Sequence, residues 1–169
     1  VQGLTSKNRI ISGRFVSEHT DPGGALAVAR HIQQFTPHVK MISTVGTEPW
    51  VDTTIREYFS DRDDLFVRDH RVTTIITQHY VEPAGDGKEM NKLFSVNYLD
   101  ADAPPKDVTA QVVERLKKAM AEADLVVAAD FGHGMMAPEV REVLQSEAPY
   151  LALNCQTNSN NHGFNIINH

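Results

Sequence analysis

Apolar residues follow two kinds of spacing along this chain. Short continuous apolar runs, which are typical of parallel strands covered on both faces, lie at residues 39–45, 125–129 and 150–153. Apolar residues recur at helical spacing at residues 25–32, 50–59, 108–121 and from residue 138 onward. With a further short strand at 65–67, this alternation predicts a three-layer α/β protein whose sheet is mainly parallel.

Three other segments are rich in β-branched and aromatic residues and are bounded by turn residues. Residues 71–81 and 93–99 are strongly β-prone, and a Pro-Ala-Gly-Asp-Gly-Lys sequence between them favours a turn. A short strand pair is also expected around Gly13. We therefore predict a small antiparallel lid from residues near 9–18, 72–81 and 92–99, and an α/β core from residues 22–60 and 106–169.

The most informative stretch runs from residue 125 to 158 and has the order of a βαβ unit. Its first apolar run ends at Asp130, and the Phe-Gly-His-Gly sequence that follows is too rich in glycine for regular structure. A helix from Pro138 then leads to the second apolar run, which ends at Asn154. Open α/β sheets bind ligands beyond the carboxyl ends of their strands. We therefore expect Asp130 and Asn154 at one edge of the sheet, in a shared site.

Composition narrows the class of protein. The 169 residues, 41% of them hydrophobic, suffice for one domain with its own core. A formal net charge of −6 without a basic block argues against nucleic acid as the main partner. No apolar run approaches the roughly 18 residues of a membrane span, and no signal peptide is visible. The single cysteine, Cys155, cannot form an internal disulfide, so we expect a cytoplasmic protein.

A second candidate for ligand binding is the diglycine Gly23-Gly24, directly before the first predicted helix. Glycines at this place let a ligand approach the backbone and the amino-terminal end of a helix. An ordinary loop with positive φ would need the same residues, so the glycines alone do not decide between the two interpretations. The helix is predicted from its alanines, and its apolar stripe contains Leu26, Ala29 and either Ile32 or Phe35.

Taken together, these features resemble the ribokinase-like (PfkB) carbohydrate kinases. The sequence Gly-Gly-Ala-Leu-Ala-Val-Ala at 23–29 is similar to the diglycine motif of that family, and the offset hairpin occurs in the same order. The likeness is closest to the kinase domains of heptose-phosphate kinase/ADP-heptose synthase-like proteins, which carry an Ala-Asp-Phe-Gly-His-Gly loop and an Asn-x-Gln-Thr-Asn loop. Both loops occur here, at 129–134 and 154–158.

The resemblance implies a ribokinase-like fold and ATP-dependent phosphoryl transfer to a hydroxyl of a sugar or sugar phosphate. It also implies ATP and Mg²⁺ as cofactors of the full-length protein. The Gly-Ala-Gly-Asp segment that carries the catalytic aspartate of the family does not occur in these residues, and Ala27 replaces the usual asparagine of the diglycine motif. We therefore expect an amino-terminal part of such a kinase, inactive alone, with its catalytic aspartate beyond His169.

With this resemblance, the candidate residues for binding a sugar or sugar phosphate are Gly23, Gly24, Asp130, His133 and Lys92, and the candidate for binding the nucleotide is Asn154. A carboxylate accepts strong hydrogen bonds from hydroxyls, and a protonated histidine can bind phosphate. Each has a structural alternative, because Asp130 can cap a loop, His133 and Lys92 can be solvated, and Asn154 can hold its own turn. The histidines form neither an HExxH sequence nor an i, i+4 pair, so no metal site is expected.

Two functions of different class remain open. The first is the carbohydrate kinase, in which Asp130 and the diglycine position the substrate while the base and the phosphate clamp come from other residues. The second is a non-catalytic or degenerate kinase half that binds a ligand or forms a homodimer through the lid strands, whose open edges need to be covered. A reading frame that continues into a Gly-Ala-Gly-Asp segment would favour the first.

Overall fold

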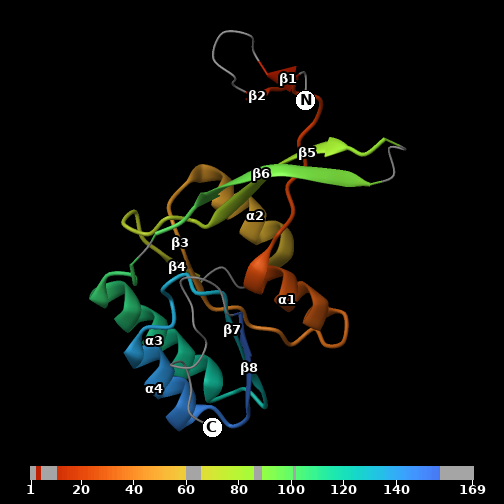
Figure 1. The fold of residues 1–169 in the computed structure, drawn as a ribbon. Coiled ribbons are helices and arrows are strands. Elements are labelled where there is room, and N and C mark those ends of the chain that lie inside the picture. The colour runs from red at the N-terminus through yellow and green to blue at the C-terminus, as the bar shows by residue number, and fades with distance from the viewer. Residues whose placement is uncertain (1–2, 5–10, 60–65, 86–88, 101, 157–169) are drawn as a thin grey trace. The chain divides into compact units, whose positions relative to one another are not determined.

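The computed structural model describes residues 3–4, 11–59, 66–85, 89–100 and 102–156. In these residues the chain has mixed α/β structure with small parallel and antiparallel sheets (Figure 1). The chain divides into two units. The hairpin unit consists of Val1–Pro22 and Thr77–Asn97, and the α/β unit consists of Gly23–Ile76 and Tyr98–His169.

Two pairs of parallel strands lie at the centre of the α/β unit. Strand β3 (Ser43–Val45) pairs with β4 (Phe66–Arg68), and β7 (Val126–Asp130) pairs with β8 (Leu151–Cys155). The helices described in this unit are α1 (Gly24–Gln33), α2 (Pro49–Phe59), α3 (Lys106–Met120) and α4 (Pro138–Glu147). A helix connects the strands of each pair, as parallel strands require, which confirms the predicted α/β alternation.

Neighbouring residues of β4 enter two different cores. Val67 is fully buried in a cluster that includes Val140 of α4 and residues of α3, whereas Phe66 is buried with Ala29 of α1 and with α2. Successive side chains of a strand point to opposite faces. Helices α3 and α4, which lie side by side in Figure 1, therefore cover one face of β4, and α1 and α2 cover the other.

The hairpin unit has a different character. Strands β5 (Ile76–Pro83) and β6 (Met90–Tyr98) form a two-stranded sheet, and the Ala84 amide donates to the Glu89 carbonyl at its turn (2.8 Å). Tyr80 stacks on Phe94 across the strands, with ring centroids 4.4 Å apart. No residue of β5 or β6 is buried. Strands β1 (Gly3–Leu4) and β2 (Ile11–Ser12) form a separate antiparallel pair in the same unit.

Near the amino-terminus one local prediction is wrong, and one pair of alternatives, Ile32 or Phe35, is decided in favour of the half-buried Ile32. Residues 13–20 contain no strand, because β2 ends before Gly13 and pairs with β1. Phe35 is 89% exposed and does not belong to the apolar stripe of α1. The helix ends at Gln33, and the Phe35 amide donates to the Ile32 carbonyl (2.9 Å), so the chain turns away before Phe35 can pack.

Strand lengths also differ from the predictions. The strand expected over 71–81 begins only at Ile76, because the Thr73 amide donates to the Asp100 carboxylate (2.7 Å) and not to a neighbouring strand. The strand expected over 39–45 is limited to β3. Three parts of the predictions lie outside the described residues: residues 9–10 of the predicted lid, Leu65, and residues 157–158 of the Asn-x-Gln-Thr-Asn loop.

Candidate functional site

The carboxyl ends of β7 and β8 lie together, as the βαβ pattern predicts. The parallel register pairs Asp130 with Cys155 and Ala129 with Asn154. The Gln156 amide donates to the Asp130 carbonyl (2.8 Å), which extends the pairing beyond the last residue of β8. Two strand ends and the loop after β7 therefore meet at one edge of this sheet.

Asp130 is the last residue of β7, and only 6% of its surface is exposed. Its Oδ1 accepts a hydrogen bond from the Gly132 amide (2.8 Å), and its Oδ2 accepts one from the Cys155 thiol (3.8 Å). The first bond makes a local turn in which Gly132 has a φ of 77°. The carboxylate therefore has the structural role that the sequence left as an alternative, at the place where a ligand is expected.

In the sequence Cys155 has no disulfide partner, and in the structure it lies directly opposite Asp130 in the register of β7 and β8. Because paired residues of neighbouring strands point to the same face, Cys155 and Asp130 share a face of the sheet. Asn154 pairs with Ala129 instead, so its exposed side chain points to the opposite face. Strand β8 also continues to Cys155, which corrects the prediction that it ends at Asn154. Only the pairing of β7 with β8 shows that Cys155 lies next to Asp130.

The diglycine lies beside the loop that follows β7. Gly23 precedes α1, and Gly24 begins the helix with a φ of 54°. A Cβ on Gly24 would lie 3.7 Å from the ring of Phe131, whereas a Cβ on Gly23 would meet open space. The positive φ alone explains why position 24 needs glycine. The start of α1 and the loop after Asp130 are thus neighbours, with the Phe131 ring next to the helix.

The remaining candidates lie in two different places. His133 is half-buried in the loop after β7, between Gly132 and Gly134, which both have positive φ. A Cβ on Gly134 would lie 2.8 Å from the backbone oxygen of Asp102, so this loop packs closely on the segment before α3. Lys92 is exposed on β6 and belongs to the hairpin unit. Its part in sugar-phosphate binding stays a prediction.

A second polar cluster, which sequence reasoning missed, lies after β3. The Thr74 hydroxyl accepts a hydrogen bond from the Gly46 amide (2.8 Å) and donates to Glu48 Oε2 (2.6 Å). The bond from Thr74 holds the pKa of Glu48 below its usual value. This cluster fastens the segment before β5 to the end of β3.

The described residues bring together no group of three or more His, Cys, Asp or Glu side chains that could hold a metal ion. Mg²⁺ at phosphoryl-transfer sites takes one or two carboxylates together with substrate phosphates and water. At the ends of β7 and β8, Asp130 supplies one carboxylate, which Gly132 and Cys155 already contact. We therefore assign no Mg²⁺ ligand among the described residues.

None of the described helices has the length and the apolar content that a membrane crossing needs. No family model matches the chain, and no curated protein matches its sequence. The resemblance to ribokinase-like kinases thus rests on the sequences at residues 23–29, 129–134 and 154–158.

Proposed function

We propose that this chain is the sugar-binding part of an ATP-dependent carbohydrate kinase with a three-layer ribokinase-like fold. The observation that carries the proposal is the meeting of two elements. Helix α1 begins at Gly24 beside Phe131, and the preceding residue, Asp130, ends β7 at its junction with β8. Carboxyl ends of parallel strands and helix amino-termini are the two commonest ligand-binding features of α/β proteins.

In this proposal Asp130 accepts hydrogen bonds from sugar hydroxyls. Because only 6% of its surface is exposed, a hydroxyl reaches Oδ2 by replacing the Cys155 thiol. A thiol is a weak donor, so this exchange is favourable. The carboxylate repels phosphate, and the phosphate of a sugar phosphate therefore lies toward the start of α1 or toward His133.

The nucleotide has a different place in the proposal. Asn154 points to the face opposite Asp130, which separates a nucleotide contact from the sugar contact. Apart from Asn154, the contacts to ATP, together with the ligands of Mg²⁺ and the catalytic aspartate, are assigned to residues outside this sequence. The proposed contribution of residues 1–169 to phosphoryl transfer is to position the acceptor hydroxyl.

Calorimetric titration of the chain with ribose, fructose phosphates and heptose phosphates tests this function. We expect saturable binding of at least one sugar or sugar phosphate, with one ligand per chain. Gly23 faces open space at the start of α1, so Gly23→Asp should weaken binding of a phosphorylated ligand by repulsion while leaving the fold intact. Absence of binding by every compound would contradict the proposal.

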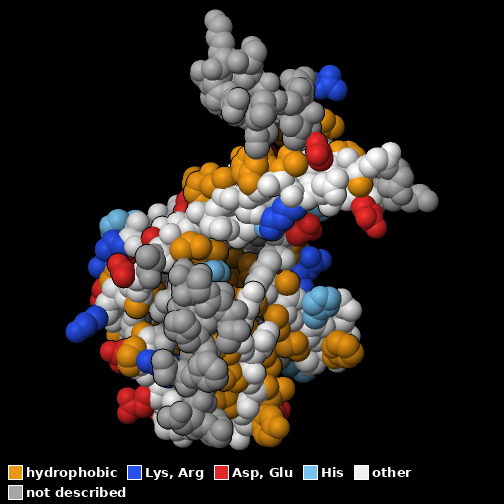
Figure 2. All heavy atoms as spheres, viewed as in Figure 1, with side chains coloured by type: hydrophobic (Ala, Val, Ile, Leu, Met, Phe, Trp, Pro, Cys, Tyr) orange, Lys and Arg blue, Asp and Glu red, His pale blue; other side chains and the backbone are white. Residues whose placement is uncertain are grey.

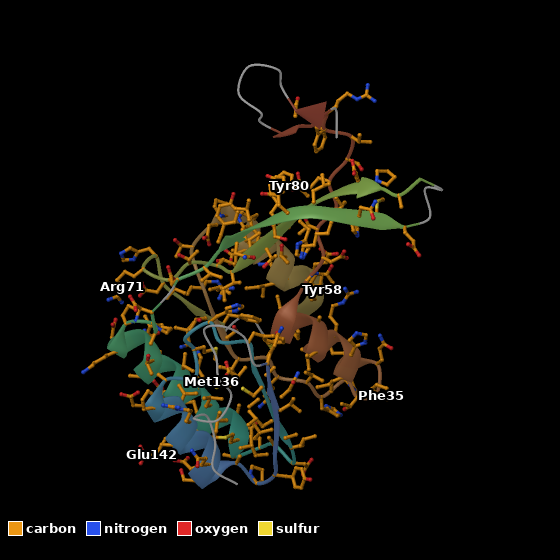
Figure 3. All side chains as sticks on the ribbon, in the orientation of Figure 1. Phe35, Tyr58, Arg71, Tyr80, Met136 and Glu142 are labelled. Atoms are coloured by element: carbon orange, nitrogen blue, oxygen red, sulfur yellow. The ribbon has the colours of Figure 1, made fainter. Side chains whose placement is uncertain are left out.

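A second candidate function, homodimer formation through the hairpin, is favoured by the side chains of β5 and β6. Tyr80 and Phe94 are 40% and 43% exposed, and Figures 2 and 3 show the apolar side chains over the hairpin and the place of Tyr80. Exposed residues at alternating positions share the face of this stack: Ile76, Met90 and Tyr98.

Sedimentation equilibrium tests the dimer. We expect a dimer for the unchanged chain and a monomer for Tyr80→Ser, because large apolar side chains exposed on one face of a hairpin mark an interaction surface. Lys106→Ser, an exposed change at the start of α3, serves as the control. A monomeric unchanged chain at all concentrations would refute this candidate and leave the kinase proposal untouched.

A further inference from the structure

The chain passes between its two units after Pro22 and, at the two ends of the hairpin, after Ile76 and after Asn97. Side-chain hydrogen bonds join the segments next to the last two passages. Asp100 Oδ2 accepts a hydrogen bond from the Thr73 amide, and Oδ1 accepts one from the Thr73 hydroxyl, both at 2.7 Å. Thr73 lies just before β5 and Asp100 just after β6, so the pair lies at the open end of the hairpin.

The residue next to Thr73 makes a different connection. Thr74 binds Gly46 and Glu48 just after β3, and so holds the segment before β5 to the end of β3 within the α/β unit. Thr73, in contrast, joins the segment before β5 to the segment after β6. At the open end of the hairpin, which we call its root, Thr73 therefore binds the segment after β6 and Thr74 binds the segment after β3.

The hairpin strands take no part in either buried core of the described residues, although Tyr80 stacks on Phe94 and His79 Nδ1 lies 2.7 Å from Ser95 Oγ. No residue of β5 or β6 is buried, and an isolated two-stranded hairpin is marginally stable in water. Joining the chain ends at the root lowers the entropy that the strands lose when they pair. Both bonds of the pair reach a carboxylate, which strengthens them, and the same two donors hold the pKa of Asp100 below its usual value.

We propose that Thr73 and Asp100 form a clasp that closes the open end of the β5–β6 hairpin and sets how often the hairpin opens. Opening then occurs as a local event, separate from unfolding of the α/β unit. Thr74 is the anchor to β3, and the clasp is the part that controls the pairing of the two strands. The clasp does not depend on the proposed kinase function.

Hydrogen exchange of the whole chain, followed by mass spectrometry, tests the clasp. We expect Asp100→Ala to speed exchange in β5 and β6 about three- to tenfold, which corresponds to the loss of one or two hydrogen bonds at an exposed place. Exchange in β7 and α3 should stay unchanged. Asp124→Ala, which removes another exposed aspartate of the α/β unit, should change none of these rates.

Substitutions of the threonines separate the clasp from a general loss of stability. Thr73→Val removes the hydroxyl and keeps the amide, so it should give part of the effect, and Thr73→Ser should restore the original rates. Thr74→Val should speed exchange around β3 as well. Unchanged hairpin exchange in Asp100→Ala, equal acceleration in β7, or a hairpin without protection in the unchanged chain would each overturn the clasp.

Discussion

Strand β4 of the α/β unit and strands β5 and β6 of the hairpin unit show how differently one chain can stabilise β structure. Phe66 and Val67 on β4 are 2% and 0% exposed, with helices on both faces. The stacked pair Tyr80 and Phe94 on the hairpin remains 40% and 43% exposed. Short strands are sufficient where helices bury them, whereas longer strands without such cover depend on the residues at their ends.

The comparison also bears on the candidate site. Asp130 and Gly24 belong to the α/β unit, where packed strands and helices fix the backbone that carries them. A binding site built on such elements holds its geometry better than one built on a free hairpin.

The same substitution in the two units should give the largest contrast. Phe66→Ala should lower the free energy of unfolding by about 3–5 kcal/mol, because it leaves a cavity beside Phe59. Phe94→Ala should cost less than about 1.5 kcal/mol, since it loses a partly exposed aromatic pair. Urea unfolding followed by circular dichroism measures both.

A smaller substitution in the same strand keeps the comparison measurable if Phe66→Ala prevents folding. Val67→Ala removes two buried methyl groups and should lower stability by less than Phe66→Ala does. Equal losses for Phe66→Ala and Phe94→Ala would show that the hairpin has a core of its own, and would break the comparison between the units.

The two glycines before α1 offer the next largest contrast. Gly24→Ala should lower stability by about 1–2 kcal/mol, because its φ of 54° strains an L-residue although its Cβ has room beside Phe131. Gly23→Ala should cost less than about 1 kcal/mol, since its φ of −110° suits alanine and its Cβ meets open space, and only the poorer N-cap preference of alanine opposes it. Thermal unfolding of both variants measures the difference, and a neutral Gly24→Ala would contradict the strained start of the helix.

Sequence patterns predicted the elements that are buried. The stripes of α2, α3 and α4 follow the periodicity of a packed core, which is a local property. The runs that became β7 and β8 predicted the two strands but not their burial: Val127 and Leu153 are 38% and 39% exposed, so these strands are not covered on both faces. The predictions were wrong where a residue of suitable propensity has no neighbouring helix or strand to pack or pair with. Phe35 stands at a helical position, but the helix ends before it, and Thr73 has high β propensity, but its amide donates to Asp100.

The smallest expected effect concerns pH. Hydrogen bonding to Thr74 lowers the pKa of Glu48 in the folded state, so its ionised form stabilises the fold above the usual glutamate pKa of about 4.3. That contribution is lost as the pH falls from there through the lowered pKa. Glu48→Gln should therefore be less stable than the unchanged chain at pH 7, and the difference should shrink as the pH falls below about 4.3.

Urea unfolding at a series of pH values measures this difference. Glu57→Gln, on the exposed surface of α2, is the matched control. A difference between Glu48→Gln and the unchanged chain that stays constant down to acid pH would mean that the charge of Glu48 contributes nothing.

The sequence predicted the position of Asp130 but not the contacts around it, because those contacts depend on strand register and helix packing. Asp130 and the meeting of two strand ends follow from the apolar runs, because the last residue of a buried run marks the edge of a sheet. The contact of Cys155 with Asp130 depends on which residues pair across β7 and β8. The contact of Gly24 with Phe131 depends on how α1 packs, and neither is visible in the spacing of residues along the chain.

Asp130→Asn tests the central claim, that this carboxylate binds sugar hydroxyls. The asparagine oxygen can still accept the hydrogen bond of the Gly132 amide, so the local turn should persist and the charge should be lost. Asp124→Asn, an exposed change just before β7, is the control. The measurement is calorimetric titration with the sugar or sugar phosphate that binds the unchanged chain, together with thermal unfolding of all three proteins. The account predicts that Asp130→Asn weakens binding by about 1–3 kcal/mol with a nearly unchanged Tm. Unchanged affinity with a clearly lower Tm would contradict it and would leave Asp130 a structural residue of the loop.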